Sequence, residues 1–180
     1  SAIWILLEEK KLSLTERVAD IIPAFGSNGK EVVTVEQLLT HTAGFPDAPF
    51  RTLDWLDLGR RYERFSQWRL AWEPGSRFQY HPTSTMWVLA EILERRGGLA
   101  FQQFIRERIA APLGLTDLYV GLPADQNERV VPCGHAGNPL TDADYESMGM
   151  PKPPVTEVTE EAILSFNDPD IRAVGVPGGG

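Results

Sequence analysis

The sequence predicts a largely helical domain of ordinary size, and three observations support this. Apolar residues recur at helical spacing in several stretches, most clearly at Met86, Leu89, Ala90 and Leu93. The 180 residues are 42% hydrophobic and 23% charged, which is typical of a globular chain with a buried core. From Leu118 on, Pro and Gly are frequent, so at most short strands or extended loops are expected there.

Local signals place the individual helices. Pro82 suits the first position of a helix, where its missing N–H is not needed, and Gly97-Gly98 ends that helix. Pro74-Gly75 favours a type II turn before it. Residues 47–70 show no clean period and are expected to form short helices and loops. The expected helices cover residues 1–10, 14–25, 82–96 and 99–110, with a short one after a capping box formed by Thr34 and Gln37.

Charge and residue usage narrow the function. The net charge of −8 argues against nucleic-acid binding, since neutralising phosphates needs clustered Lys and Arg. The single cysteine, Cys133, allows no internal disulfide, and the early apolar run over residues 3–7 is too short to span a membrane. The histidines His41, His81 and His135 show no metal-binding spacing, so no metal or cofactor is expected. Compartment and oligomeric state stay open.

One nucleophile pattern occurs, because Ser27-Asn-Gly-Lys30 matches S-x-x-K. A catalytic Ser and Lys at this spacing must share one helix face so that the amine reaches the hydroxyl. Asn28 and Gly29 favour a loop instead, so the pattern is interpreted as a chance match. Lys30 is expected to lie on a loop or at the surface, like the other lysines, Lys10, Lys11 and Lys152.

Five segments taken in order carry a more specific signal. They are LLEEKKLSLTERVADIIPAF, VTVEQLLTHTAGFP, WEPGSRFQYHPTSTMWVLAEILERRGG, FQQFIRERIAAPLGLTDLYVGLP and the closing VGVPGGG. Together they resemble the serine β-lactamase-related superfamily, which includes class C β-lactamases, D-Ala-D-Ala carboxypeptidases and β-lactamase-fold esterases. The resemblance implies an α+β, β-lactamase/transpeptidase-like fold, of which this chain covers mainly the helical lobe. Residues 1–180 are then expected to be a partial domain, truncated at both ends.

The resemblance also implies a site. Members of the family use an S-x-x-K pair, a Tyr-x-Asn motif whose Tyr shuttles a proton, and a K-T-G or H-x-G motif on a strand. Tyr80 falls at the position of that Tyr, and the segment LLTHTAGF is expected to be scaffold near the site. The S-x-x-K pair is expected before Ser1 and the third motif beyond Gly180. Pro82 replaces the Asn and offers no side-chain hydrogen bond, which favours an esterase-like activity over efficient β-lactam or peptide recognition.

Tyr80 is therefore the candidate catalytic residue, and His81, Pro82, Gly178 and Gly179 are candidates to line the site. A free tyrosine has a pKa near 10, so a tyrosine base needs a nearby ammonium, which the family's Lys would supply. His81 either starts the helix before Pro82 or faces the site and protonates the leaving group. The first role is favoured, because neighbouring side chains in an extended chain point apart.

The expected function is that of a serine hydrolase with an acyl-enzyme mechanism, acting on a small-molecule ester, amide or β-lactam-like substrate. The 180 residues alone are expected to be inactive and poorly stable, because the nucleophile and the sheet are missing. Two alternatives stay open. One is a catalytically dead binding protein with the same fold, and the other is an unrelated helical interaction domain in which Tyr80 only precedes a helix.

Overall fold

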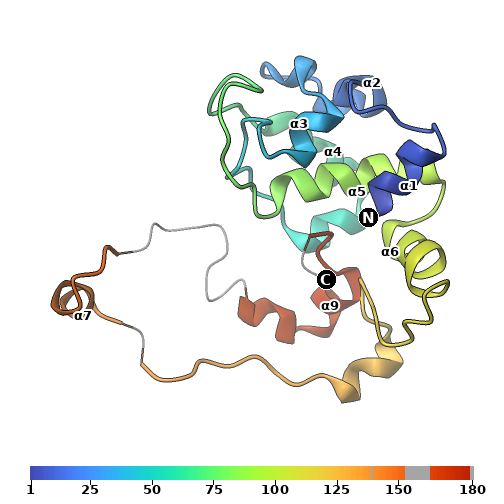
Figure 1. Ribbon diagram of the computed structural model, residues 1–180. Helices are drawn as coiled ribbons and strands as arrows, with labels where there is room; N and C mark the ends of the chain where they lie inside the picture. Colours follow the sequence, from blue (N-terminus) through green and yellow to red (C-terminus); the bar gives the residue numbers. More distant parts are fainter. Residues whose placement is uncertain (139, 153–162, 179–180) are drawn as a thin grey trace.

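The computed structural model describes residues 1–138, 140–152 and 163–178 (Figure 1). Within these ranges the chain is helical, and its β-pairing is limited to one isolated bridge between Arg17 and Thr34. The α-helices are α1 Ala2–Glu8, α2 Val18–Ile21, α3 Val35–Leu39, α4 Leu58–Gln67, α5 Ser84–Gly97, α6 Phe101–Ile105, α7 Asp142–Ser147 and α9 Pro169–Val174. The 3-10 helices are η1 Pro23–Phe25, η2 Lys30–Val32, η3 Thr52–Leu56, η5 Ala124–Arg129 and η6 Ser165–Asn167, while η4 Arg106–Ala110 is a π-helical turn after α6.

Helix α5 is the central element of the fold. Of the predicted stripe, Leu89, Ala90 and Leu93 are buried and Met86 is partly buried. The opposite face, with Trp87 and Ile92, is buried as well. A helix that is buried all round belongs to the core rather than the surface. Helices α1, α3 and α6 pack against it, and Figure 1 shows it crossing the body between them.

The start of α5 differs from the prediction by two residues. The helix begins at Ser84 with Thr83 as its N-cap, so Pro82 lies before the helix and not at its first position. The backbone N–H of His81 donates to the Nδ1 atom of His41, at 3.2 Å, which fastens the segment before the helix to residues 40–46.

The single helix predicted over residues 14–25 was wrong, because only Val18–Ile21 is α-helical and Pro23–Phe25 form the separate 3-10 helix η1. Residues 14–17 run beside residues 33–36, with bonds from Val35 N to Glu16 O at 3.0 Å and from Val18 N to Val33 O at 2.9 Å. These bonds take backbone groups that a helix would need, so α2 starts only at Val18.

Two local predictions are confirmed. The capping box forms at α3, since Gln37 N donates to Thr34 Oγ1 at 3.3 Å and Thr34 N donates to Gln37 Oε1 at 3.0 Å. The turn at Pro74-Gly75 also forms, with a bond of 3.0 Å from Ser76 N to Glu73 O and a φ of +86° at Gly75.

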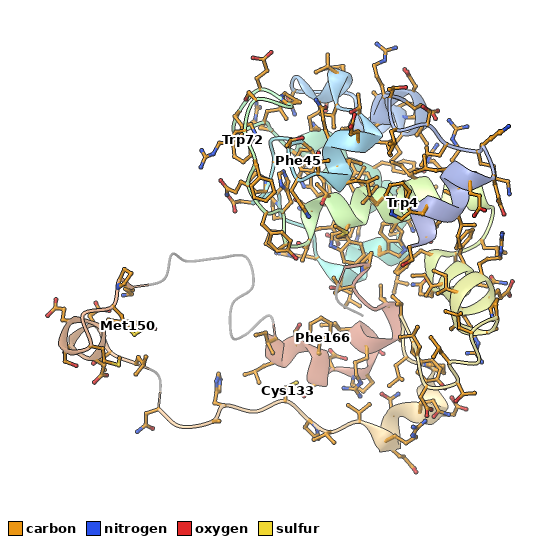
Figure 2. All side chains as sticks on the ribbon, in the orientation of Figure 1. Trp4, Phe45, Trp72, Cys133, Met150 and Phe166 are labelled. Carbon is orange, nitrogen blue, oxygen red and sulfur yellow. The ribbon has the colours of Figure 1, made fainter. Side chains whose placement is uncertain are left out.

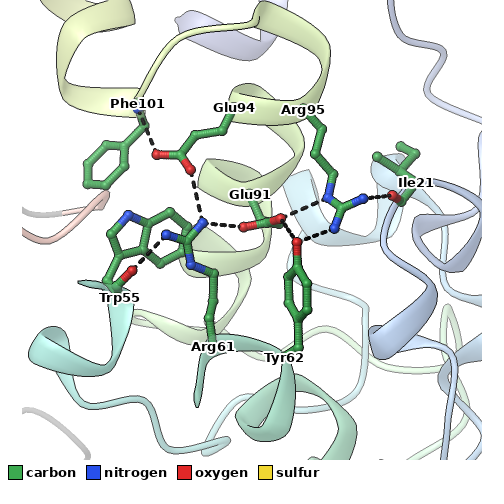
Figure 3. Close-up of polar contacts among 8 residues, drawn as sticks. All are labelled: Ile21, Trp55, Arg61, Tyr62, Glu91, Glu94, Arg95 and Phe101. Carbon is green, nitrogen blue, oxygen red and sulfur yellow. Dashed lines mark hydrogen bonds and ion pairs between the residues drawn. The ribbon is translucent and has the colours of Figure 1, made fainter. Parts of the chain in front are cut away.

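A polar network joins α4 to α5 inside the body (Figure 3). The Arg61 guanidinium of α4 contacts Glu91 of α5 at 2.5 Å and Glu94 at 2.9 Å, and donates to the Trp55 carbonyl at 2.6 Å. It also stacks on the Trp55 ring, 3.6 Å from the ring centroid. Arg61 and Glu91 are both buried, so this contact belongs to the core.

The last third of the chain leaves the body and returns to it. Residues 130–138 and 140–152 run outward from the body, with α7 far from it, and Figure 2 shows Met150 standing clear of the body. Cys133 is still bonded to Asn167 of the returning segment, at 2.8 Å in both directions. Residues 163–178 then come back, with α9 packed near η3. The short strands allowed for after Leu118 are not seen in the described part of this stretch, which holds short helices instead.

Candidate active site

Tyr80 lies in the extended segment before α5. Its side chain is 62% exposed, whereas the side chain of the next residue, His81, is fully buried. The two side chains therefore point apart, as the extended backbone predicts.

His81 has neither of the two roles predicted for it. Its Nε2 atom accepts a hydrogen bond from Phe45 N at 3.1 Å, so the ring proton sits on Nδ1, which lies 2.6 Å from the Gln79 carbonyl oxygen. Burial lowers the pKa of His81, which keeps the ring neutral in this arrangement. The residue is a buried tie between two loops, so it neither caps α5 nor faces an open site.

The segment THTAGFP, residues 40–46, supports the whole stretch that leads to α5. Ala71 N donates to the Gly44 carbonyl oxygen at 2.7 Å, and Gly75 N donates to that of Thr42 at 2.8 Å. The Ser84 hydroxyl donates to the Phe45 carbonyl oxygen at 2.9 Å. The loop that carries Tyr80 is thus bonded along its length to residues 40–46, which lie about 30 to 40 residues earlier in the sequence.

His41 is the member of this segment that sequence reasoning left without a role of its own. Its ring centroid lies 4.8 Å from that of Tyr80. In the sequence, only its position inside the segment LLTHTAGF pointed to His41. The residues next to His41 in the chain do not indicate a contact with Tyr80.

The structure brings Pro82 and Gly178 together. A Cβ atom added at Gly178 would lie 2.7 Å from Met86 Cγ and 3.6 Å from the Pro82 carbonyl oxygen. The returning C-terminal segment therefore packs on the first turn of α5, close to the loop of Tyr80. Gly179, the other glycine predicted to line the site, lies outside the described residues.

Lys30, expected to lie on a loop or at the surface, follows a loop as the first residue of η2, but it is not at the surface. The side chain is fully buried, and Nζ lies 2.7 Å from Ser27 O, 2.6 Å from Trp68 O and 3.3 Å from Ser27 Oγ. The S-x-x-K pair does meet, but through a loop in which Gly29 has a φ of +86°. The Ser27 hydroxyl donates to Ser66 O at 2.8 Å and Nζ is bonded to carbonyls, so the pair ties loops together.

Two hollows of apolar character flank the first turns of α5. One of about 420 Å³ is lined by residues that include Trp4, Met86 and Pro177. Another of about 370 Å³ is lined by residues that include Thr83 and Trp87.

In the part of the chain that the structure describes, no group of three or more His, Cys, Asp or Glu side chains is placed to hold a metal ion. No described helix is long and apolar enough to cross a membrane.

Comparison with known proteins decides the family. Residues 2–179 match the family profile described as Beta-lactamase. The chain belongs to the β-lactamase family. An Escherichia coli K12 protein with a provisional name as a D-alanyl-D-alanine carboxypeptidase is 32% identical over 124 residues, which are 62% of this chain and 28% of that protein. The esterase/beta-lactamase LipL of Mycobacterium tuberculosis is 33% identical over 118 residues, covering 63% of this chain and 27% of LipL.

A solved structure agrees with this assignment. A family VIII carboxylesterase shares 32% identity with a TM-score of 0.74, over 98% of this chain and 47% of the carboxylesterase. The chain thus spans less than half of that structure and under a third of the two curated relatives. The fold is the β-lactamase/transpeptidase fold, and this β-lactamase-family chain is helix-rich, as the helical lobe of that fold should be.

Proposed function

We propose that this chain is part of a serine hydrolase that cleaves esters through an acyl-enzyme, with Tyr80 transferring the proton. The observation that supports this role is the placement of Tyr80, whose exposed side chain stands on a loop fastened at both sides to residues 40–46. A group that moves a proton in a transition state has to be accessible and held in place.

In the proposed mechanism a serine hydroxyl attacks the ester carbonyl while Tyr80 takes its proton. Tyr80 then gives the proton to the departing alkoxide, and water hydrolyses the acyl-enzyme in the second half of the reaction. Ser27 and Lys30 are poor candidates for the nucleophilic pair, since their polar groups are engaged with main-chain carbonyls. The proposal therefore assigns the nucleophile to a part of the domain beyond these 180 residues, treats residues 1–180 as a partial domain truncated at both ends, and expects them to be inactive alone.

Esters are the favoured substrates for two reasons. Pro82 stands two residues after Tyr80 and has no side-chain donor for the amide of a peptide or β-lactam. The carboxylesterase is the structural relative with 32% identity over nearly this whole chain, and LipL is also named as an esterase.

The test is the Tyr80→Phe variant of the full-length protein, assayed with a chromogenic ester. We expect turnover to fall at least about a hundredfold, as for loss of a general acid–base group. Tyr145→Phe, on the distant helix α7, is the matched control and should keep its turnover. The isolated 180 residues should show none. Unchanged turnover in Tyr80→Phe, or turnover by the 180 residues alone, would contradict the proposal.

A further inference from the structure

We propose that His41 is a positioning residue for Tyr80, which it holds through hydrogen bonds to the main chain on both sides. The inference rests on the proposed function of Tyr80, and it gives a role to a residue that the mechanism above leaves unused.

The first observation is a pair of hydrogen bonds that bracket Tyr80. The N–H of Gln79 donates to the His41 carbonyl oxygen at 3.2 Å, and the N–H of His81 donates to His41 Nδ1 at 3.2 Å. The residues before and after Tyr80 are thus fixed by one and the same residue. The Tyr80 side chain, which lacks a buried environment, takes its direction from this fixed backbone.

The second observation is the protonation state that the bonds require. Because His41 Nδ1 accepts from a main-chain N–H, the proton of the neutral ring sits on Nε2. Burial lowers the pKa of His41 and so favours that neutral form. The ring of His81 is held by a similar bond, since its Nε2 atom accepts from Phe45 N.

The third observation is the backbone of His41, which has a φ of +57°. This left-handed conformation is common for the residue after a helix C-cap, and here Thr42 N donates to Gln37 O at 3.0 Å and His41 N donates to Leu38 O at 3.4 Å. At this position, one residue after the C-cap Thr40 of α3, the backbone turns both the carbonyl oxygen and the ring of His41 toward residues 79–81. The ring also lies beside that of Tyr80, with the centroids 4.8 Å apart and the planes tilted by 53°.

The experiment compares two variants of the full-length protein in ester hydrolysis. His41→Asn keeps an acceptor, because Oδ1 lies as many bonds from Cα as Nδ1 does, and Asn tolerates a positive φ. His41→Phe keeps an aromatic ring but has no acceptor. We expect kcat to fall about tenfold or more in His41→Phe with KM nearly unchanged, and to stay within about threefold of wild type in His41→Asn, because misplacing a reacting group slows the chemical step more than binding. If His41→Phe does not fold, His41→Gly replaces it, since it lacks the acceptor and adopts this φ without strain.

A double variant separates positioning from a general structural effect. In a Tyr80→Phe background, the acceptor-free His41 variant should cause little further loss, because the residue it positions is already gone. Wild-type kcat in the acceptor-free variant, an equal loss in His41→Asn, or a fully additive loss in the double variant would overturn the inference. If instead Tyr80→Phe itself keeps full turnover, the proposed function fails first, so the two failures are distinguishable.

Discussion

At the scale of single residues, Lys30 shows how a loop is held by one buried charge. Its ammonium group lies against the carbonyl oxygens of Ser27, three residues earlier, and of Trp68, 38 residues later. It also lies 5.4 Å from the Phe25 ring centroid. Removal from water disfavours the charged form, so burial lowers the pKa of Lys30 to about 8. A neutral amine would still have two N–H groups for the two carbonyl oxygens.

This pKa predicts a pH dependence of stability. In the unfolded chain Lys30 has its ordinary pKa of 10.5, so between pH 8 and 10.5 the unfolded state binds more protons than the folded state. The contribution of Lys30 to the free energy of unfolding should therefore rise by up to about 3 kcal/mol as the pH increases from 8 to 10.5. The same amount is lost when the pH falls back to 8.

The measurement is urea denaturation of wild type and Lys30→Met at several pH values, taking the difference so that other titrating groups cancel. Lys10→Met, at an exposed lysine after α1, is the control and should show a flat difference. A difference between wild type and Lys30→Met that does not change from pH 8 to 10.5 would refute the shifted pKa.

At the scale of elements, the join between α4 and α5 depends on a set of buried charges (Figure 3). Glu91 accepts from Arg61, from Arg95 at 2.8 Å and from the Tyr62 hydroxyl at 3.1 Å. Arg95 also reaches the Ile21 carbonyl oxygen at 3.0 Å, so the set extends from α4 through α5 to α2. Burial removes these charged groups from part of their water, and this cost is offset by their attraction to one another.

Arg61→Met tests this join. The change leaves the Glu91 carboxylate buried with one cation fewer and the Trp55 carbonyl without its donor, so we expect a loss of about 3 kcal/mol or more in the free energy of unfolding. Arg17→Met removes an exposed pair with Asp20 and should cost under about 1 kcal/mol. Denaturation curves of the two variants in the full-length protein give the comparison, and equal losses would show that the buried network is dispensable.

At the scale of the whole molecule, the return of the C-terminal segment depends on a close crossing of two backbones. Leu122 N donates to Arg172 O at 2.8 Å, and the Gln102 side chain donates to Val174 O at 2.9 Å. Gly121 and Gly175 allow the crossing, since a Cβ atom at Gly121 would lie 2.7 Å from the Ala173 carbonyl oxygen. The crossing holds residues 175–178 beside α5 and so places Gly178 near the loop of Tyr80.

Gly121→Ala should destabilise the packing of the C-terminal segment at this crossing. Its matched control is Gly137→Ala, because Gly121 and Gly137 have φ values of +77° and +79°, but only Gly121 has neighbours within 4 Å. Both variants bear the cost of a side chain at positive φ, and Gly121→Ala bears the clash in addition, about 1–3 kcal/mol more. Hydrogen exchange should show faster exchange of the Leu122 amide in Gly121→Ala only. Equal exchange in the two variants would mean that the crossing does not hold the segment.

Sequence alone determined the features that depend on near neighbours along the chain. The capping box at Thr34 and the turn at Gly75 need groups no more than three residues away, and the apolar stripe of α5 needs only its own period. The order of the family segments also led to the right family and to Tyr80 as the candidate catalytic residue, a role that stays a prediction.

Tertiary structure decided the features whose partners lie far along the chain. Lys30 is buried because Trp68 supplies an acceptor 38 residues later, and the segment before α5 is held by the bond from His81 to His41 across 40 residues. The helix expected from residue 14 gives way to pairing with residues 33–36 for the same reason. A buried polar group must find a partner wherever the fold provides one, and that partner cannot be read from the residues beside it.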